Sequence, residues 1–379
     1  MMSHRPKRIK YFQSLTIAMM LVFPIIAHGC KAKATEPAVK PNSSGKIVVG
    51  YYFNFQNGYD LGNIMYGNLT HIAHAFGIPN SNGTLNIDGI SSQISGFART
   101  VHQNNKKAVL SVGGWSGSSN FSGVAADSNK RHAFASALKA FCLSNNYDGV
   151  DIDWEYPFFR ERTNVTRLIQ EIGDSLRAGT AHFTISITIP YSIGGTGFSI
   201  ADLESHLDWI GVMTYDYSTC ASLTANDNAP LSRIESDIAA LLATASPEKL
   251  LLGIPFYGRQ YHCPSGPSIG ALVDGCIDMP FSMLPDFSQG GWQRRWDTTS
   301  SVPYLINQST NQLISYDDQQ SIQSKCQWLK GKKLGGAIVW ALGQDRSGSA
   351  QPLLCTVGLE LLGNYCKPPT DSDSLKNTK

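Results

Sequence analysis

Residues 147–157 read Tyr147-Asp148-Gly149-Val150-Asp151-Ile152-Asp153-Trp154-Glu155-Tyr156-Pro157, and they form the most informative segment of the chain. Successive side chains of a β-strand point to opposite faces, so Asp151, Asp153 and Glu155 lie together on one face. The opposite face carries Val150, Ile152 and Trp154, which suit packing against helices. The sequence therefore predicts a strand over 148–155 that is apolar on one side and carries three acids on the other.

Segments of similar length and apolar character recur on both sides of this strand. Counting Asp148–Glu155, eight strands are predicted: Lys46–Phe53, His71–Phe76, Lys107–Gly113, Asp148–Glu155, Phe183–Pro190, Trp209–Asp216, Leu250–Tyr257 and Gly335–Leu342. Helix-period segments lie between several of them: Ser128–Ser144, Asn164–Ala178, Leu231–Ala243 and Ser321–Leu329. Continuous apolar strands alternating with helices indicate a parallel sheet buried on both faces, and eight such units predict a (β/α)₈ TIM barrel. A doubly wound open sheet is the alternative, but no Gly-x-Gly-x-x-Gly follows an early strand.

One connection is far longer than a barrel loop. About 75 residues separate Tyr257 from Gly335, and they contain the short strand candidates Tyr304–Asn307 and Leu313–Tyr316. We expect a small α+β domain over 259–330, inserted between strands 7 and 8. The catalytic barrel itself is predicted over 45–366.

Composition excludes several classes of protein. The chain has 379 residues, 42% of them hydrophobic and 16% charged, with a formal net charge of +2. That apolar fraction is ample for a folded core, and the charge balance offers no basic stripe for nucleic acid. Only one long apolar run occurs, which excludes a multi-span membrane protein.

The first 29 residues are predicted to be an export signal. Four basic residues and no acid precede the apolar stretch 14–27, which is short for a membrane span but suits a signal peptide. Ala27-His28-Gly29-Cys30 resembles a bacterial lipobox, so lipid attachment to Cys30 and ordinary cleavage after Gly29 both fit. Residues 30–44 are expected to be a flexible linker and 367–379 a disordered tail. The mature protein would then be secreted or anchored to the cell envelope by lipid alone, with 27 basic and 29 acidic residues.

Eight cysteines suit an oxidising destination, where disulfides form. Cys263 with Cys276 and Cys355 with Cys366 are the locally plausible pairs, although connectivity cannot be deduced from sequence alone. No Cys-x-x-Cys spacing occurs, so no metal site is expected.

Three neighbouring acids on one strand face need an explanation, because burying like charges is costly unless they share protons or have partners. A solvated edge strand is disfavoured by the apolar flanks. A metal site made of three carboxylates is disfavoured by the absence of nearby histidines. The remaining interpretation is acid–base chemistry, since neighbouring carboxylates drive one another's pKa values apart. No cofactor is required.

Several motifs occur in order from about Lys46 to Asp345. They are Ser111-Val112-Gly113-Gly114, Asp148-x-x-Asp151-x-Asp153-x-Glu155, Met213-Thr214-Tyr215-Asp216, Gly253-Ile254-Pro255-Phe256-Tyr257-Gly258-Arg259, Trp296-Asp297, Ser315-Tyr316-Asp317 and Gly336-Ala337-Ile338-Val339-Trp340. This series resembles the family 18 glycoside hydrolases, the chitinases of bacterial type. The resemblance implies a TIM barrel that cleaves the β-1,4 bonds of chitin or chito-oligosaccharides.

The resemblance also implies roles for the acids. In this family the substrate's own acetamido oxygen acts as nucleophile, giving an oxazolinium ion and net retention. Glu155 would be the general acid and base, Asp153 would hold the acetamido group, and Asp151 would tune Asp153. Tyr215 would orient the acetamido carbonyl, and Asp216 would support the acid.

Further residues are implied to bind sugar or to support the acids. Those expected to contact substrate are Trp340 as an apolar floor, with Tyr257, Arg259, Met213, Trp115, Tyr51 and Phe53. Those expected behind them are Ser111 as a hydrogen-bond donor, Gly113 and Gly114 as space, and Asp148, whose role is the least defined. A sugar-binding lectin and an endo-β-N-acetylglucosaminidase acting on glycoproteins remain alternatives. We expect a monomer.

Overall fold

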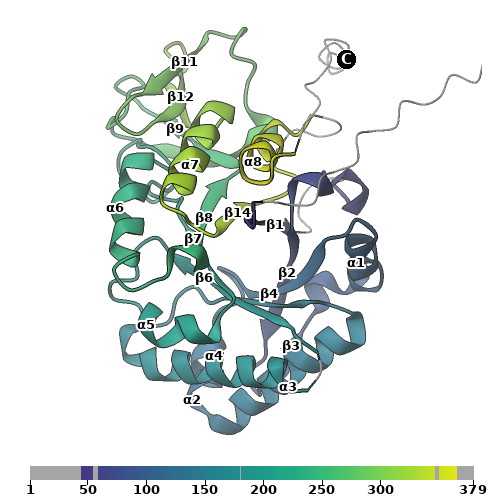
Figure 1. Cartoon of the computed structure of the whole chain (residues 1–379). Helices are drawn as coiled ribbons and strands as arrows, with labels where there is room; N and C mark the ends of the chain where they lie inside the picture. Colours follow the sequence, from purple (N-terminus) through teal and green to yellow (C-terminus); the bar gives the residue numbers. More distant parts are fainter. Residues whose placement is uncertain (1–43, 54–58, 180, 346–349, 365–379) are drawn as a thin grey trace, which may run out of the picture. The chain divides into compact units, whose positions relative to one another are not determined.

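The computed structural model describes residues 44–53, 59–179, 181–345 and 350–364 (Figure 1). The predicted signal peptide 1–29 and tail 367–379 lie outside these residues, as does all but the last residue of the predicted linker 30–44. Cys30 and Cys366 are outside them too. Within the described part, no helix is both long and apolar enough to cross a membrane.

Eight parallel strands close into a barrel. They are β1 (Ile47–Phe53), β2 (His71–Pro79), β4 (Lys107–Gly113), β5 (Gly149–Asp153), β6 (Thr184–Pro190), β7 (Trp209–Met213), β8 (Leu250–Pro255) and β14 (Gly336–Trp340). Their order is β1-β14-β8-β7-β6-β5-β4-β2, and β1 also pairs with β2, which completes the ring. The short β3 (Leu85–Asn86) adds an antiparallel pairing at the end of β2. The predicted TIM barrel is confirmed, and every predicted barrel strand overlaps an observed one.

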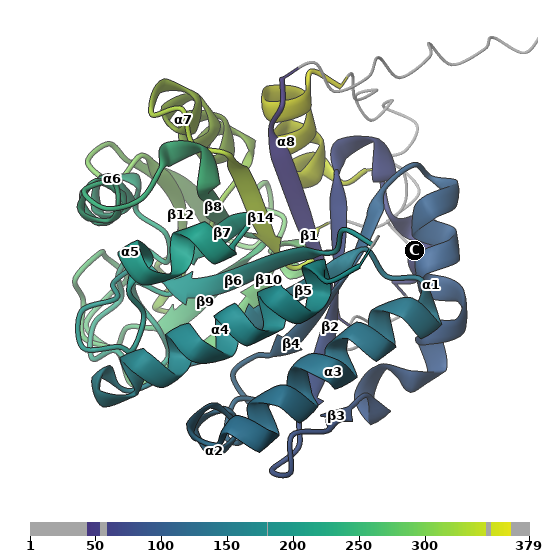
Figure 2. The same ribbon diagram turned by 60° about the horizontal axis from the view of Figure 1, so that its bottom comes forward.

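Helices cover the outside of the barrel (Figure 2). They are α1 (Ser91–Gln103), α2 (Phe121–Ala126), α3 (Ser128–Asn145), α4 (Arg162–Arg177), α5 (Ile200–Leu203), α6 (Leu231–Leu241), α7 (Gln319–Gly331) and α8 (Pro352–Leu362). The Asp127 side chain begins α3 by accepting hydrogen bonds from the backbone N–H of Asn129 and Lys130. The helix stops at Asn146, whose φ of 58° turns the chain towards β5.

The two faces of the barrel strands bury different side chains. Outward-facing residues such as Val150, Ile152 and Leu252 join the large cluster under the helices. Inward-facing residues such as Val49, Val109 and Leu251 form a smaller apolar cluster inside the ring. Towards the carboxyl ends of the strands the buried interior becomes polar: Ser111, Asp151, Asp153, Ser186 and Thr188. This is the end at which TIM barrels place their chemistry.

The inserted region is a five-stranded antiparallel sheet. Its strands are β9 (Tyr257–His262), β10 (Gly275–Pro280), β11 (Trp292–Asp297), β12 (Val302–Asn307) and β13 (Gln312–Ser315), in the order β10-β9-β13-β12-β11. The sheet starts two residues before the predicted boundary at 259. Helix α7, which lies largely within the predicted range, packs against α8.

The disulfide of the insertion differs from the expected one. Cys276 is bonded to Cys220, in the loop after β7, and Cys263 is a buried free thiol. The prediction of Cys263 with Cys276 is wrong, because Cys276 faces Tyr261 in the β9–β10 ladder while Cys263 lies beyond the end of β9. Cys355 is disulfide-bonded, but the expected partner Cys366 lies outside the described residues.

Candidate active site

A cavity of about 640 Å³ opens at the carboxyl end of the barrel strands. It is lined by acids, hydroxyls and aromatic rings contributed by many strands and the loops after them: Tyr51, Phe53, Ala75, Phe76, Ile78, Gly89, Gly113, Trp115, Ser116, Gly117, Asp153, Glu155, Thr188, Met213, Tyr215, Asp216, Tyr257 and Trp340. Cavities of this size and mixed lining are typical of small-molecule and substrate sites.

The inner acid, Asp151, is only 2% exposed and is surrounded by neutral hydroxyl groups. One carboxylate oxygen accepts hydrogen bonds from Tyr51 Oη at 2.8 Å and Ser111 Oγ at 3.0 Å. The other accepts from Ser186 Oγ at 2.7 Å, and Thr188 Oγ1 lies 3.3 Å and 3.4 Å from the two oxygens. Burial raises the pKa of Asp151, and these hydroxyl donors act against that rise by stabilising the anion.

The middle acid, Asp153, is nearly as deeply buried as Asp151 but has fewer hydrogen-bond partners. It is 4% exposed, and its Oδ1 has no hydrogen-bond partner within the described part of the chain. Burial raises the pKa of Asp153 well above its usual range, and the charges of Glu155 and Asp151 raise it further. Asp153 is therefore more easily protonated than the better hydrogen-bonded Asp151.

The outer acid, Glu155, follows the end of β5 and faces the cavity. Burial raises its pKa to about 7, and the charge of Asp216 adds to the rise. Its backbone N–H donates to Ser118 Oγ at 2.9 Å, and Ser118 Oγ in turn donates to the backbone oxygens of Gly114 and Asp153. A carboxyl group whose pKa is near the working pH can both give and take a proton.

Gly113, the last residue of β4, and Gly114, which follows it, allow their chain segment to lie very close to its neighbours. A Cβ on Gly113 would lie 2.1 Å from the backbone oxygen of Asp153, and one on Gly114 would lie 2.7 Å from the ring of Phe76. Both glycines have a positive φ, 114° and 73°, which residues with a Cβ rarely adopt. The structure therefore explains why the sequence has glycine at both positions.

A second group of polar residues follows β7. Tyr215, 6% exposed, lines the cavity, and its ring meets the Tyr257 ring edge-on at a centroid distance of 6.0 Å. Asp216 has a left-handed φ of 60° and accepts a hydrogen bond from Tyr257 Oη at 2.6 Å. Arg259 bridges Asp216 and Asp278 of the insertion, and does not line the cavity. The insertion thus fixes Asp216 through Arg259.

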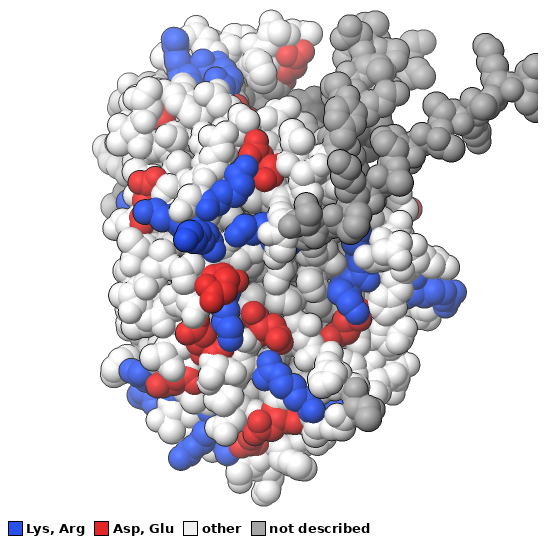
Figure 3. Space-filling model, in the orientation of Figure 1, with Lys and Arg blue, Asp and Glu red and all other residues white. Residues whose placement is uncertain are grey.

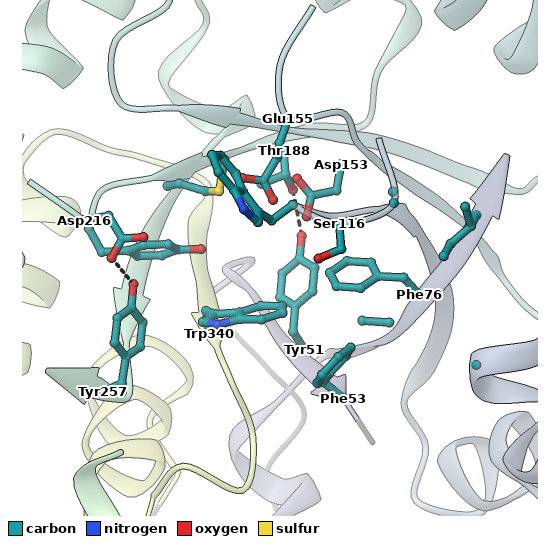
Figure 4. Close-up of a pocket in the computed structure, with 18 residues that line it drawn as sticks. Tyr51, Phe53, Phe76, Ser116, Asp153, Glu155, Thr188, Asp216, Tyr257 and Trp340 are labelled. Atoms are coloured by element: carbon teal, nitrogen blue, oxygen red, sulfur yellow. Dashed lines mark hydrogen bonds between the residues drawn. The ribbon is translucent and has the colours of Figure 1, made fainter. Parts of the chain in front are cut away.

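Aromatic rings form the opposite wall. Trp340, the last residue of β14, lies across the cavity from Glu155 and Asp153 (Figure 4). It contacts Tyr51, Phe53 and Phe76 at centroid distances of 5.6 Å, 6.1 Å and 5.8 Å. Trp115, 76% exposed, stands at the cavity rim. One wall can therefore take an apolar ring face while the other acts on polar groups.

The model of glycosyl hydrolases family 18 matches residues 47–345, which is most of the chain. The chain belongs to glycosyl hydrolases family 18.

Two solved structures and one curated protein show how this family member compares with its relatives. Chitinase A1 of Niallia circulans is 28% identical over 91% of this chain, which spans 62% of that relative's length. The structure of a Cycas revoluta family 18 chitinase in complex with allosamidin is 25% identical, with a TM-score of 0.76 over 84% of this chain and 99% of its own. A family 18 N-acetylglucosaminidase from Paenibacillus barengoltzii is 26% identical, with a TM-score of 0.75 over 83% of this chain and 100% of its own.

Asp148 stands apart from the other acids of the family signature. It precedes β5 at the amino end of the strand, and its carboxylate accepts from Lys107 Nζ at 2.8 Å and the backbone N–H of Ala108 at 2.8 Å, and pairs with His102 Nε2 at 2.7 Å. These partners lower the pKa of Asp148 in spite of its partial burial. Its position is that of a structural residue at the opposite end of the strand from the cavity.

Several site residues were missed by sequence reasoning. Ser186 and Thr188 on β6 contact Asp151, while Phe76 and Ser116 line the cavity. The alternation of Ser186, Thr188 and apolar residues along β6 is a period-2 pattern that could have revealed two polar groups facing the acids.

The described residues hold no group of three or more His, Cys, Asp or Glu side chains arranged for a metal ion. On the face shown in Figure 3, acidic and basic side chains of the described residues are interspersed, without an extended patch of either sign.

Proposed function

We propose that this family 18 protein is a chitinase that hydrolyses the β-1,4 bonds between N-acetylglucosamine units with retention of configuration. The observation that carries the proposal is the arrangement of Asp153 and Glu155. Both have raised pKa values, and both border one cavity that is large enough for a sugar.

The first step breaks the glycosidic bond. Protonated Glu155 gives its proton to the glycosidic oxygen, and the acetamido oxygen of the same sugar attacks C1 as the bond to the leaving group breaks. Asp153 passes its proton to Asp151 in this step, so that its carboxylate can accept the acetamido N–H and stabilise the positive charge of the oxazolinium ion. Tyr215 donates to the acetamido oxygen and aims it at C1. The hydroxyl groups around Asp151 stabilise its carboxylate before the proton arrives from Asp153.

The second step restores the enzyme. Glu155, now a carboxylate, removes a proton from water, and the hydroxide attacks C1 from the side the leaving group vacated. The oxazolinium ring opens, the acetamido group re-forms, and Glu155 is protonated again. Two inversions give net retention. Trp340 supports the apolar face of the sugar during both steps, since it lies opposite the acids (Figure 4).

Similarity supports the choice of substrate. Chitinase A1 and the allosamidin-bound chitinase resemble this chain over most of its described length. A lectin would not need a carboxyl group with a pKa near 7 at the cavity. The solved N-acetylglucosaminidase is as similar to this chain as the allosamidin-bound chitinase is. Similarity therefore does not decide the length of the released sugar, which has to be measured.

The decisive experiment replaces Glu155→Gln and follows hydrolysis of chitohexaose by chromatography. We expect kcat to fall by at least about 10³-fold, because the amide neither gives nor accepts the proton, while binding persists. Asp148→Asn is the matched control, since it makes the same chemical change in the same signature away from the cavity. A parent that binds chitohexaose without cutting it would refute the enzyme and favour the lectin. A parent that cuts only glycoprotein glycans would favour the endo-β-N-acetylglucosaminidase.

Export is part of the proposal, because polymeric chitin is met outside the cell. The signal expected at 1–29 and the Cys220–Cys276 disulfide both suit an oxidising compartment. We further propose that the mature enzyme acts as a monomer. The mass of the mature N-terminal peptide decides whether Cys30 carries lipid, and light scattering of the purified enzyme gives the oligomeric state.

A further inference from the structure

Asn228 lies in the connection between β7 and α6, and the proposed chemistry does not use it. The residue is fully buried, and it does not line the cavity. Four hydrogen bonds nevertheless join it to three segments of the chain: the turn after β7, strand β9 and strand β13. A buried amide is costly unless it is hydrogen-bonded, so the partners of Asn228 account for its place in the fold.

Asn228 holds the backbone on both sides of the Asp216 Cα. The N–H of Asp216 donates to Asn228 Oδ1 at 3.3 Å, and the N–H of the next residue, Tyr217, donates to the Asn228 backbone oxygen at 3.0 Å. Asp216 has a φ of 60°, in the left-handed region that residues with a Cβ rarely adopt. Because one neighbour fixes both peptide groups, this uncommon conformation is kept in place.

Asn228 also contacts the strands that supply partners to the Asp216 side chain. Asn228 Nδ2 donates to the Tyr257 backbone oxygen at 3.3 Å, while Tyr257 Oη donates to the Asp216 carboxylate at 2.6 Å (Figure 4). The Asn228 N–H donates to Ser315 Oγ at 2.8 Å. Ser315 lies opposite Arg259 in the β9–β13 ladder, and Arg259 forms an ion pair with Asp216. Backbone and side-chain restraints on Asp216 therefore meet at Asn228.

The direction of the Asp216 carboxylate matters because Asp216 and Glu155 line the same cavity. The charge of Asp216 adds to the rise that burial causes in the pKa of Glu155. A residue that relaxes from the left-handed region to the usual negative φ turns its side chain in a different direction. Without its contacts to Asn228, Asp216 would be free to relax in this way, and its carboxylate would leave its place in the cavity.

We propose that Asn228 is a positioning residue for the acid step, because it holds Asp216 in the left-handed conformation that directs its carboxylate into the cavity lined by Glu155. This inference rests on the proposed function, since it assigns Asn228 a part in the same reaction. Asn228 does not touch the substrate in this role, because it is buried outside the cavity. It acts through Asp216, which distinguishes it from a residue that only stabilises the fold.

The test is a double-mutant cycle on chitohexaose hydrolysis, made of Asn228→Ala, Asp216→Asn and the variant that combines them. We expect Asn228→Ala to lower kcat about 30-fold, because it misplaces a group at the reacting centre, and to leave KM within about threefold. The combined variant should be within about threefold of Asp216→Asn alone, since no carboxylate is left to position. Two residues that act independently would instead multiply their losses.

The pH profile of Asn228→Ala gives a readout that a loss of stability alone would not move. With the charge of Asp216 farther away, the pKa of Glu155 falls, so the alkaline limb of kcat/KM should move to lower pH by about half a unit. Three other titratable groups lie near Glu155 and are unaltered in this variant: Asp153, Tyr156 and Tyr215.

Asn307→Ala is the matched control. Asn307 is a buried asparagine of the insertion whose side chain donates to the Gly290 oxygen at 2.9 Å and accepts from the Ser309 N–H at 3.1 Å, and it does not line the cavity. It should lose stability in thermal unfolding but keep the kcat and the alkaline limb of the parent. Ser315→Ala is a milder variant, since it removes only the acceptor of the Asn228 N–H. We expect it to lower kcat about threefold, with no further loss in the Asp216→Asn background.

Four results would overturn the role of Asn228 while leaving the chitinase in place: an unchanged kcat or alkaline limb in Asn228→Ala, losses that multiply in the combined variant, an equal loss in Asn307→Ala, or an Asp216→Asn variant as active as the parent. A parent that does not cleave chitohexaose would overturn the proposed function itself, and this inference with it. If Asn228→Ala does not fold, Ser315→Ala decides the question, and a loss that persists in the Asp216→Asn background, or no loss, overturns the role.

Discussion

The two ends of strand β5 carry acids of one signature in opposite environments. At the amino end, Asp148 is held by Lys107, His102 and a backbone N–H, and its pKa is lowered. At the carboxyl end, Asp153 and Glu155 lack cationic partners among the described residues that surround them, and their pKa values are raised. Carboxyl groups of one signature therefore have a lowered pKa at one end of the strand and raised pKa values at the other. What surrounds a carboxyl group decides its role.

The sharpest test of this contrast is the pH dependence of chitohexaose cleavage. Glu155 must be protonated to act as the acid, and its pKa is raised to about 7. We therefore expect kcat/KM to fall about tenfold for each pH unit above pH 7, roughly a hundredfold by pH 9. The profile is recorded between pH 4 and pH 9.5 at constant ionic strength. A kcat/KM that stays constant up to pH 9 would show that Glu155, at the carboxyl end of β5, is not the catalytic acid.

A smaller effect is expected from Ser186→Ala, which removes the 2.7 Å hydrogen bond to Asp151. With one donor fewer, the charge on Asp151 is less stable, and Asp151 competes more strongly with Asp153 for the proton. We expect kcat to fall about tenfold and the acidic limb of the pH profile to move upward. Ser118→Ala serves for comparison, because the hydrogen bonds recorded for Ser118 Oγ are all to backbone groups: the oxygens of Gly114 and Asp153 and the N–H of Glu155. An unchanged acidic limb in Ser186→Ala would show that the hydroxyl only fills space.

The smallest effect on activity is expected at the other end of the strand. Asp148→Asn should leave kcat/KM within about threefold but lower the free energy of unfolding by about 1–3 kcal/mol, the range for hydrogen bonds to charged groups. Because the folded state lowers the pKa of Asp148, the stabilisation is present above the unfolded pKa and lost as the pH falls through the folded one. The stability difference between parent and variant should therefore shrink below about pH 4. Urea unfolding at pH 7 and pH 3 measures it.

Local pattern was enough to predict the barrel and the shared face of the acids. Most barrel strands are largely apolar runs, and the period of two over the predicted strand 148–155 places Asp151, Asp153 and Glu155 on one face without further information. The contacts between distant segments could not be predicted in this way. Ser186 reaches Asp151 because β6 pairs with β5, and Cys276 reaches Cys220 because β10 lies beside the loop after β7. Nothing in the sequence indicated that Arg259, expected to contact sugar, pairs with Asp216 and with Asp278 of the insertion.

The Cys220–Cys276 bond closes a covalent ring across two parts of the molecule. The 56-residue separation encloses helix α6, barrel strand β8 and insertion strand β9. A protease that cuts once inside this ring leaves both fragments attached, so the nicked chain runs as a single band until it is reduced. Without a reductant, we expect the insertion and the barrel to unfold in one transition. Once a reductant opens the ring, we expect each of them to unfold in a transition of its own.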